Sequence, residues 1–329
     1  MLWTRPRYRV ISPPRPPEAM TTSDNLDGAL AAAVAELSTV ADFIRFGASL
    51  FNGHDLHYGH GTDNATDEAL SLVLHGLHLE PGLAHELFAS RLTRGEREMV
   101  AGLLKRRVEE RIPAAYLTGE AWFAGLKFSV TKDVLVPRSP LAEWIERGFD
   151  PWLATAEVRR VVDVGTGSGC IAVACAVAFE HAEVDAVDIS TAALAVARGN
   201  VEAHGLSDRV HLLHGDLLEP CQGPYDLIIS NPPYVPTASF AALEAEYRHE
   251  PAAGLVAGKD GLDCVRKLLG AARDHLGAGG LLVVEVGEAR DAVRKAWPDT
   301  PFAWLEFERG GDGVFAIQRE QLPLSGTSD

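Results

Sequence analysis

The chain has 329 residues, and its 30 basic and 46 acidic side chains give a formal net charge of −16. An acidic surface disfavours nucleic acid phosphates and favours cationic partners, so a basic protein substrate fits better than bare DNA. No apolar run reaches the roughly 18 to 20 residues of a membrane span, which argues against a membrane protein. No CxxC pair links the four cysteines, so we expect reduced thiols in the cytoplasm and no zinc site: Cys170, Cys175, Cys221 and Cys264.

The N-terminal part of the chain is expected to be helical. Residues 1–19 hold five prolines and four arginines without an apolar signal core, which predicts a disordered tail, with an organelle transit peptide as the alternative. Apolar residues recur every three or four positions over residues 24–46 and predict one helix, and a second is expected over residues 67–77. A capping box at Thr93 opens a third. Because no strand alternates with these helices, residues 20–119 are expected to form a helical domain.

The rest of the chain predicts an α/β fold. Aromatic and β-branched residues over 121–136 indicate a β-hairpin within a linker at residues 120–156. Strands and helices then alternate through residues 157–329, which predicts a parallel sheet covered by helices. Residues 304–307 and 314–317 indicate a closing antiparallel hairpin. The parallel strands are expected near Val161, Val184, Val210, Leu227 and Leu282.

A glycine-rich turn follows the first of these strands. It joins a β-branched run, residues 160–164, to a small-residue segment, residues 170–179, that we expect to be helical. Bare backbone at such a turn can approach a nucleotide-like ligand closely. The dinucleotide fingerprint GxGxxG requires glycine or alanine where this chain has Cys170, so NAD is disfavoured. The turn consists of Gly165, Thr166, Gly167, Ser168 and Gly169.

Acidic residues end three successive expected strands. Asp163, just before the turn, can act on an ammonium group directly or through water. Asp188 is placed to accept hydrogen bonds from two ribose hydroxyls, and Asp216 to accept one from the amino group of adenine. Taken singly, each acid is more often a helix cap or a turn residue. The ordered set with the glycine turn predicts S-adenosylmethionine as the cofactor.

A rigid polar loop follows the fourth expected strand, residues 225–230. The Asn231 side-chain oxygen and the Pro232 carbonyl can accept both hydrogens of a planar NH2 group, which directs the nitrogen lone pair at a methyl donor. Pro232 and Pro233 fix the backbone, and Tyr234 offers a ring face to the flat group. Proline pairs usually only end strands. Behind a cofactor motif, the sequence NPPY predicts a catalytic clamp composed of Asn231, Pro232, Pro233 and Tyr234.

Three further features have simpler interpretations. His54, His57 and His60 are spaced for a metal, but no standard zinc pattern supplies a fourth ligand, so polar or packing histidines and no metal are expected. Basic residues 105–107 alternate with Glu109 and Glu110, which is typical of a solvated helix face. Arg138 either reaches the site or stabilises the linker.

These motifs resemble the protein N5-glutamine methyltransferases, a branch of the class I S-adenosylmethionine-dependent enzymes, over residues 24–322. The resemblance implies an N-terminal helical substrate-recognition domain, a hairpin linker and a Rossmann-like core with a seven-stranded, mostly parallel sheet. It implies that residues 231–234 clamp a glutamine. The matching segments are residues 111–117, 123–125, 134–138, 163–169, 231–234, 247–251, 260–263 and 285–287. The implied cofactor contacts are Asp163, Gly165, Thr166, Gly167, Ser168, Gly169, Asp188, Asp216 and Asn231.

Within that family, three segments resemble the branch that methylates a glutamine of the large-subunit ribosomal protein L-three. They are residues 57–64, where His57 replaces a tryptophan, residues 134–140 and residues 310–315. Members that act on peptide release factors usually carry PRPDTE after the hairpin, where this chain has PRSPLAE. L-three is therefore the implied substrate, and a release factor is the alternative.

Two more distant functions remain as alternatives. NPPY also occurs in enzymes that methylate the exocyclic amino group of adenine, although the acidic chain disfavours a nucleic acid substrate. A catalytically idle adapter would not need the amide clamp, so the intact NPPY argues against it. The sequence leaves the oligomeric state and the position of the modified glutamine open.

Overall fold

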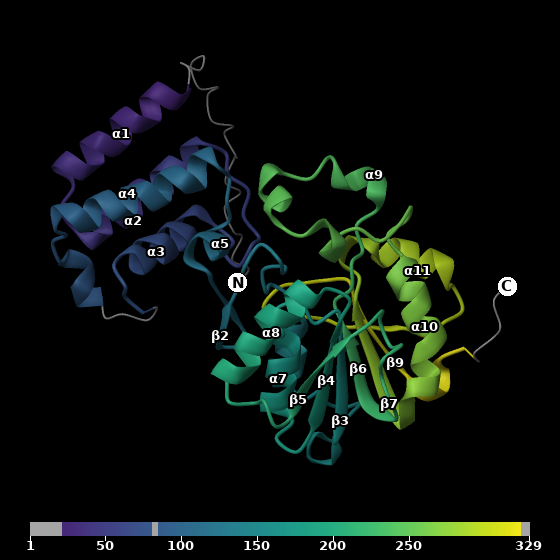
Figure 1. Cartoon of the computed structure of the whole chain (residues 1–329). Helices are drawn as coiled ribbons and strands as arrows, with labels where there is room; N and C mark the ends of the chain where they lie inside the picture. The colour runs from purple at the N-terminus through teal and green to yellow at the C-terminus, as the bar shows by residue number, and fades with distance from the viewer. Residues whose placement is uncertain (1–21, 81–84, 324–329) are drawn as a thin grey trace, which may run out of the picture.

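The computed structural model describes residues 22–80 and 85–323, and the tail expected at residues 1–19 lies outside them (Figure 1). Helices at the N-terminus surround a core that includes Phe43, Phe51, Leu72 and Leu104. No helix in the described ranges is long and apolar enough to cross a membrane. The helices are α1 (Thr22–Glu36), α2 (Val40–Gly53), α3 (Ala65–Gly76), η1 (His85–Ala89), α4 (Arg94–Glu109) and α5 (Ala114–Thr118). The predicted helices at residues 67–77 and after Thr93 are confirmed.

The prediction of one helix over residues 24–46 is wrong, because the chain breaks between α1 and α2. The Thr39 side chain accepts a hydrogen bond from the Asp42 N–H at 3.1 Å, and the Asp42 carboxylate accepts from the Thr39 N–H at 2.9 Å. This capping box starts a new helix. Apolar periodicity continues across the break because Leu30 and Val40 face the same core.

The β-hairpin is confirmed but is shorter than predicted. Its strands are β1 (Glu120–Phe123) and β2 (Leu126–Ser129), joined through Ala124 and Gly125 at positive φ. Two residues with positive φ suit a tight turn between antiparallel strands. The chain leaves the hairpin after Ser129 and reaches the short helix α6 (Leu141–Glu146). The apolar residues of the intervening segment line a pocket or contact the core instead of extending the strand.

The predicted α/β core is confirmed as a seven-stranded sheet in the order β5-β4-β3-β6-β7-β9-β8, with β9 antiparallel to both of its neighbours. Helices cover both of its faces (Figure 1). Along β3, Val161 joins the apolar cluster on one face and Val162 joins the cluster on the other. The strands are β3 (Arg160–Val164), β4 (Glu183–Asp188), β5 (Val210–His214), β6 (Tyr225–Ser230), β7 (Leu276–Glu285), β8 (Ala303–Trp304) and β9 (Val314–Gln318).

Sequence signals for most of the covering helices are also confirmed. Ser190 caps α8 by accepting a hydrogen bond from the Ala193 N–H at 3.2 Å. The longer core helices are α7 (Cys170–Ala178), α8 (Thr191–Ala203), α10 (Asp263–His275) and α11 (Arg290–Ala296). Shorter segments are η2 (Thr155–Glu157), α9 (Thr237–Phe240), η3 (Ala245–His249), η4 (Ala252–Gly254), η5 (Gly287–Ala289) and η6 (Arg319–Gln321).

The direction of strand addition changes between β3 and β6, which are adjacent and parallel. Val164 pairs with Ser230 at the ends of these strands, and the Ser230 hydroxyl donates to the Val164 carbonyl at 2.7 Å. Gly165 and Asn231 therefore leave the sheet side by side. Open α/β sheets hold their ligands in the crevice at such a point.

Buried charges join the N-terminal helices to the core. The Arg107 side chain on α4 is 1% exposed, so the solvated helix face predicted for residues 105–107 is wrong at this position. Its guanidinium donates to Glu68 at 2.5 Å and to Glu246 of η3 at 3.0 Å, and to the His57 carbonyl at 2.8 Å. Burial acts to raise the pKa of Glu246, but the hydrogen bond from Arg107 helps to hold that pKa below its ordinary value. Arg107 thus bridges two buried carboxylates, and Arg111 also pairs with Glu246 at 3.4 Å.

We predict that Arg107→Met lowers the free energy of unfolding by about 3 to 5 kcal/mol, because the buried Glu68 loses its arginine partner and Glu246 is left with the longer contact to Arg111. Urea denaturation followed by circular dichroism measures the change. Arg106→Met on the same helix is the matched control, since Arg106 is half exposed and its ion pair with Glu110 lies on the helix surface. That control should stay within about 0.5 kcal/mol of the parent protein. Equal effects of the two substitutions would contradict the assignment.

Candidate active site

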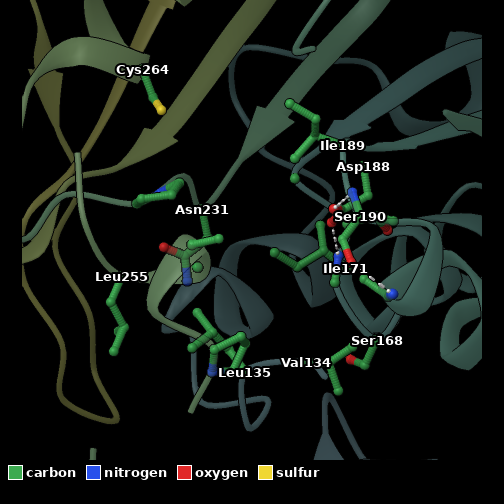
Figure 2. Close-up of a pocket in the computed structure, with 18 of the residues that line it drawn as sticks. Val134, Leu135, Ser168, Ile171, Asp188, Ile189, Ser190, Asn231, Leu255 and Cys264 are labelled. Carbon is green, nitrogen blue, oxygen red and sulfur yellow. Dashed lines mark hydrogen bonds between the residues drawn. The ribbon is translucent and has the colours of Figure 1, made fainter. Parts of the chain in front are cut away.

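One pocket of about 320 Å³ lies at the carboxyl ends of the central strands. Figure 2 shows Asn231 on one side of it and Asp188 and Ser190 on the other, with Val134 and Leu135 at its lower edge. The volume falls within the usual range for small-ligand pockets, which is roughly 300 to 1,000 Å³. Nine of the predicted site residues line it: Gly165, Thr166, Gly167, Ser168, Asp188, Asp216, Asn231, Pro233 and Tyr234.

Three predicted site residues do not line this pocket: Asp163, Gly169 and Pro232. Gly169 has a packing role, since a Cβ added there would lie 3.2 Å from the Ala197 Cβ on α8. Its φ of 81° is also a left-handed value that favours glycine. Pro232 is buried behind its neighbours in the loop.

The glycine turn is held against the neighbouring strand by its backbone. The Gly165 and Thr166 N–H groups both donate to the Val187 carbonyl at 2.9 Å. The Gly167 N–H donates to the Asp188 carboxylate, also at 2.9 Å. The turn therefore fixes the position of Asp188 and leaves the bare backbone of Gly165 and Gly167 on the pocket wall.

Asp163 lies beneath the turn and is fully buried. Its Oδ2 accepts hydrogen bonds from the Thr166 hydroxyl at 2.6 Å and from the Ala172 N–H at 3.1 Å. Its Oδ1 is buried without a hydrogen-bond partner in the described part of the chain. Burial raises the pKa of Asp163 from 3.8 to about 7. The residue thus supports the turn and keeps one acceptor oxygen for a donor.

The other two acids face the pocket. The second Asp188 oxygen accepts from the Ser190 N–H at 2.8 Å, and a carboxylate with two such bonds retains further lone pairs for ligand hydroxyls. Asp216 follows β5 and pairs with Lys267 of α10 at 2.6 Å. This exposed ion pair leaves the other Asp216 oxygen available to a ligand donor.

Sequence reasoning missed most of the pocket wall. Residues 133–137 and 139 of the linker, residues 251 and 253–256 after η3, and the side chains of Ile189, Cys264 and Glu285 all line it. Most are apolar and carry no chemical signal of their own. The linker, the 247–251 segment and the 285–287 segment did match family motifs, and these matches were the available signal.

Arg138 both reaches the pocket wall and stabilises the linker, so both interpretations hold. Its guanidinium binds both oxygens of the buried Glu250, one at 2.8 Å, and lies 5.7 Å from the Tyr247 ring centroid. His60 packs against Tyr247 with ring centroids 4.6 Å apart, and burial lowers the pKa of His60 to about 3. No group of three or more potential metal ligands was found among the described residues.

Asp163 gives the stability of the protein a pH dependence. Because the folded pKa is raised to about 7, the folded state binds more protons than the unfolded state between pH 3.8 and 7. Asp163 thus favours folding below pH 3.8, and this contribution is lost as pH rises toward 7. We predict that the melting temperature of Asp163→Asn, taken relative to that of the parent at the same pH, rises as pH increases from 3.8 to 7. A constant difference between pH 4 and 7.5 would contradict the shifted pKa.

Comparisons with known proteins place the chain in a family. The Methyltransferase small domain family matches residues 151–245. A ribosomal protein uL3 glutamine methyltransferase of Xanthomonas campestris pv. campestris is 52% identical over 293 residues, covering 89% of this chain and 95% of the relative. Proteins of the same name from Bordetella pertussis and Xylella fastidiosa are each 49% identical, covering 87% and 88% of this chain and 97% and 93% of the relatives. The chain therefore belongs to the ribosomal protein uL3 glutamine methyltransferase family, and it is a methyltransferase.

Proposed function

We propose that this protein transfers a methyl group from S-adenosylmethionine to the side-chain nitrogen N5 of one glutamine in ribosomal protein uL3, the L-three protein of the sequence prediction. The observation that carries the proposal is the shared pocket of the glycine turn and NPPY. Val164 and Ser230 are paired, so a cofactor motif and an amide clamp begin at neighbouring positions. Methyl transfer needs this proximity.

The residues present fit the proposed cofactor. Asp188 offers acceptors for the ribose hydroxyls, and Asp216 offers one for an adenine amino group. The unpaired Asp163 Oδ1 suits the ammonium of an amino-acid tail, through water because Asp163 does not line the pocket. When bound, S-adenosylmethionine supplies an electrophilic methyl group on a sulfonium.

The clamp overcomes the poor nucleophilicity of an amide. The Asn231 oxygen and the Pro232 carbonyl would accept the two amide hydrogens, so that the nitrogen lone pair points across the pocket. This use of Pro232 requires its carbonyl, and not its buried ring, to face the substrate. Tyr234 lines the same wall and would keep the amide plane flat against its ring. The extra proton of the methylated nitrogen can then pass to an adjacent acceptor or to water.

The substrate assignment rests on the names of the relatives and on charge. All three relatives are named for uL3, and the chains align over nearly their whole lengths. A net charge of −16 favours a basic ribosomal protein, and a cytoplasmic location fits both this substrate and the free cysteines. Two substrates compete with uL3 in this assignment. One is a peptide release factor, and the other is the amino group of adenine in nucleic acid.

We predict that Asn231→Ala loses at least about 90% of its turnover, because it removes one acceptor of the transition-state clamp. Its affinity for S-adenosylmethionine should stay within a few-fold of the parent. Asp188→Ala is the contrasting variant and should weaken cofactor binding by about 1 to 3 kcal/mol. Calorimetry measures the affinities, and transfer of labelled methyl groups measures turnover. Near-normal turnover of Asn231→Ala would remove it from the clamp.

The substrate is tested by offering purified uL3, a release factor and a methyl-free DNA side by side with labelled cofactor. We expect label in one glutamine of uL3, with slower association at higher salt because screening weakens attraction between opposite charges. Preferential labelling of the release factor would move the chain to the sister branch. Label in adenine alone would contradict glutamine methylation.

A further inference from the structure

Glu285, a pocket residue that no proposed catalytic step uses, receives hydrogen bonds from two different parts of the chain. It ends β7 and is buried. One carboxylate oxygen accepts from the Ser139 hydroxyl at 2.5 Å, and the other accepts from the Tyr234 hydroxyl at 3.3 Å. Burial raises the pKa of Glu285, while Ser139, Arg138 and Tyr234 act in the opposite direction. This buried carboxyl group connects Ser139 of the linker to Tyr234 of the NPPY loop.

Tyr234, one of the residues joined by Glu285, is closely confined. A Cβ added at Gly287 would lie 2.8 Å from the Tyr234 ring, and a Cβ added at Gly261 would lie 2.2 Å from its carbonyl oxygen. Both glycines have positive φ. The two glycines thus leave the space that Tyr234 occupies, with its hydroxyl 3.3 Å from Glu285.

Ser139, the other donor, is held by the start of α6. Its Oγ accepts from the Leu141 N–H at 3.1 Å while its hydroxyl hydrogen is directed to Glu285. Ser139 is itself buried, so solvent does not compete for this hydrogen bond. The linker that carries the pocket-lining residues 133–139 is thereby connected through Glu285 to the NPPY loop.

We propose that Ser139 and Glu285 are positioning residues for Tyr234, fixing the ring against which the substrate amide lies. The inference rests on the proposed function, since it assigns them a part in amide methylation. Ring placement matters because small displacements of a group that orients a nucleophile slow the reaction steeply. Ser139 acts on the reaction only through Glu285 and the Tyr234 hydroxyl.

A double-mutant cycle tests this route. Ser139→Ala should lower kcat about three- to tenfold, as expected when one buried hydrogen bond in a positioning network is lost, and Tyr234→Phe should do the same. In the Tyr234→Phe background, Ser139→Ala should change kcat by less than about twofold, because the connection is already broken. The KM for uL3 and the cofactor affinity should change little in each variant. Equal effects of Ser139→Ala in both backgrounds would overturn the proposal.

Ser139→Thr, which keeps a hydroxyl, is the matched control and should retain most of kcat. Ser139→Ala also removes the acceptor of the Leu141 N–H, so thermal stability is measured for every variant. A purely structural effect of losing this hydrogen bond would persist in the Tyr234→Phe background. That background therefore separates stability from positioning.

A readout without substrate separates this inference from the proposed function. The chain has six tyrosines, and 13C-labelled tyrosine places few signals in an NMR spectrum. The Tyr234 signal is identified by its loss in Tyr234→Phe and should shift in both Ser139→Ala and Glu285→Gln. An unchanged signal would overturn the positioning role, whether or not the enzyme methylates uL3. Inactivity of the parent enzyme on uL3 with a shifted signal would instead contradict the proposed function alone.

Discussion

Parallel pairing of β3 with β6 is the constraint on which the site depends. Sixty residues of sequence lie between these strands, yet their register aligns Val164 with Ser230 and sets the glycine turn beside NPPY. A shift of this register by one residue would invert the alternation that sends Val161 and Val162 into different apolar clusters. The packing of both sheet faces therefore fixes the relative position of the cofactor turn and the clamp. Site geometry follows from core packing.

Buried charges complete the pocket from the other side. Glu246 and Glu250, at the two ends of η3, bind arginines of α4 and of the linker, respectively. Segment 251–256, which follows, contributes much of the pocket wall. Arg107 of α4 and Arg138 of the linker thus hold one wall of the pocket through buried ion pairs that are costly to break. This arrangement ties the N-terminal helices to the segment that lines the pocket.

Local signals in the sequence were sufficient for much of the fold, and nine of the twelve predicted site residues line the same pocket. Strand alternation, the Thr93 and Ser190 caps and the glycine turn depend on neighbours close in sequence, and all were predicted. The break before Val40 was missed because helices on both sides face one core. Local charge patterns carry no information about the contacts of Arg107 with Glu246 and of Glu285 with Ser139, because these partners lie 139 and 146 residues away in sequence. For Glu285 the family motif at residues 285–287 was the available signal.

We infer that NPPY clamps a planar amide opposite the glycine turn. A crystal structure of the enzyme with the demethylated cofactor and a glutamine peptide from uL3 would show the clamp. We expect the amide nitrogen to lie within hydrogen-bond distance of both the Asn231 Oδ1 and the Pro232 carbonyl, with the amide plane against Tyr234. The nitrogen should also face the cofactor sulfur. A glutamine side chain bound elsewhere, or a cofactor away from Asp188, would rule out the clamp.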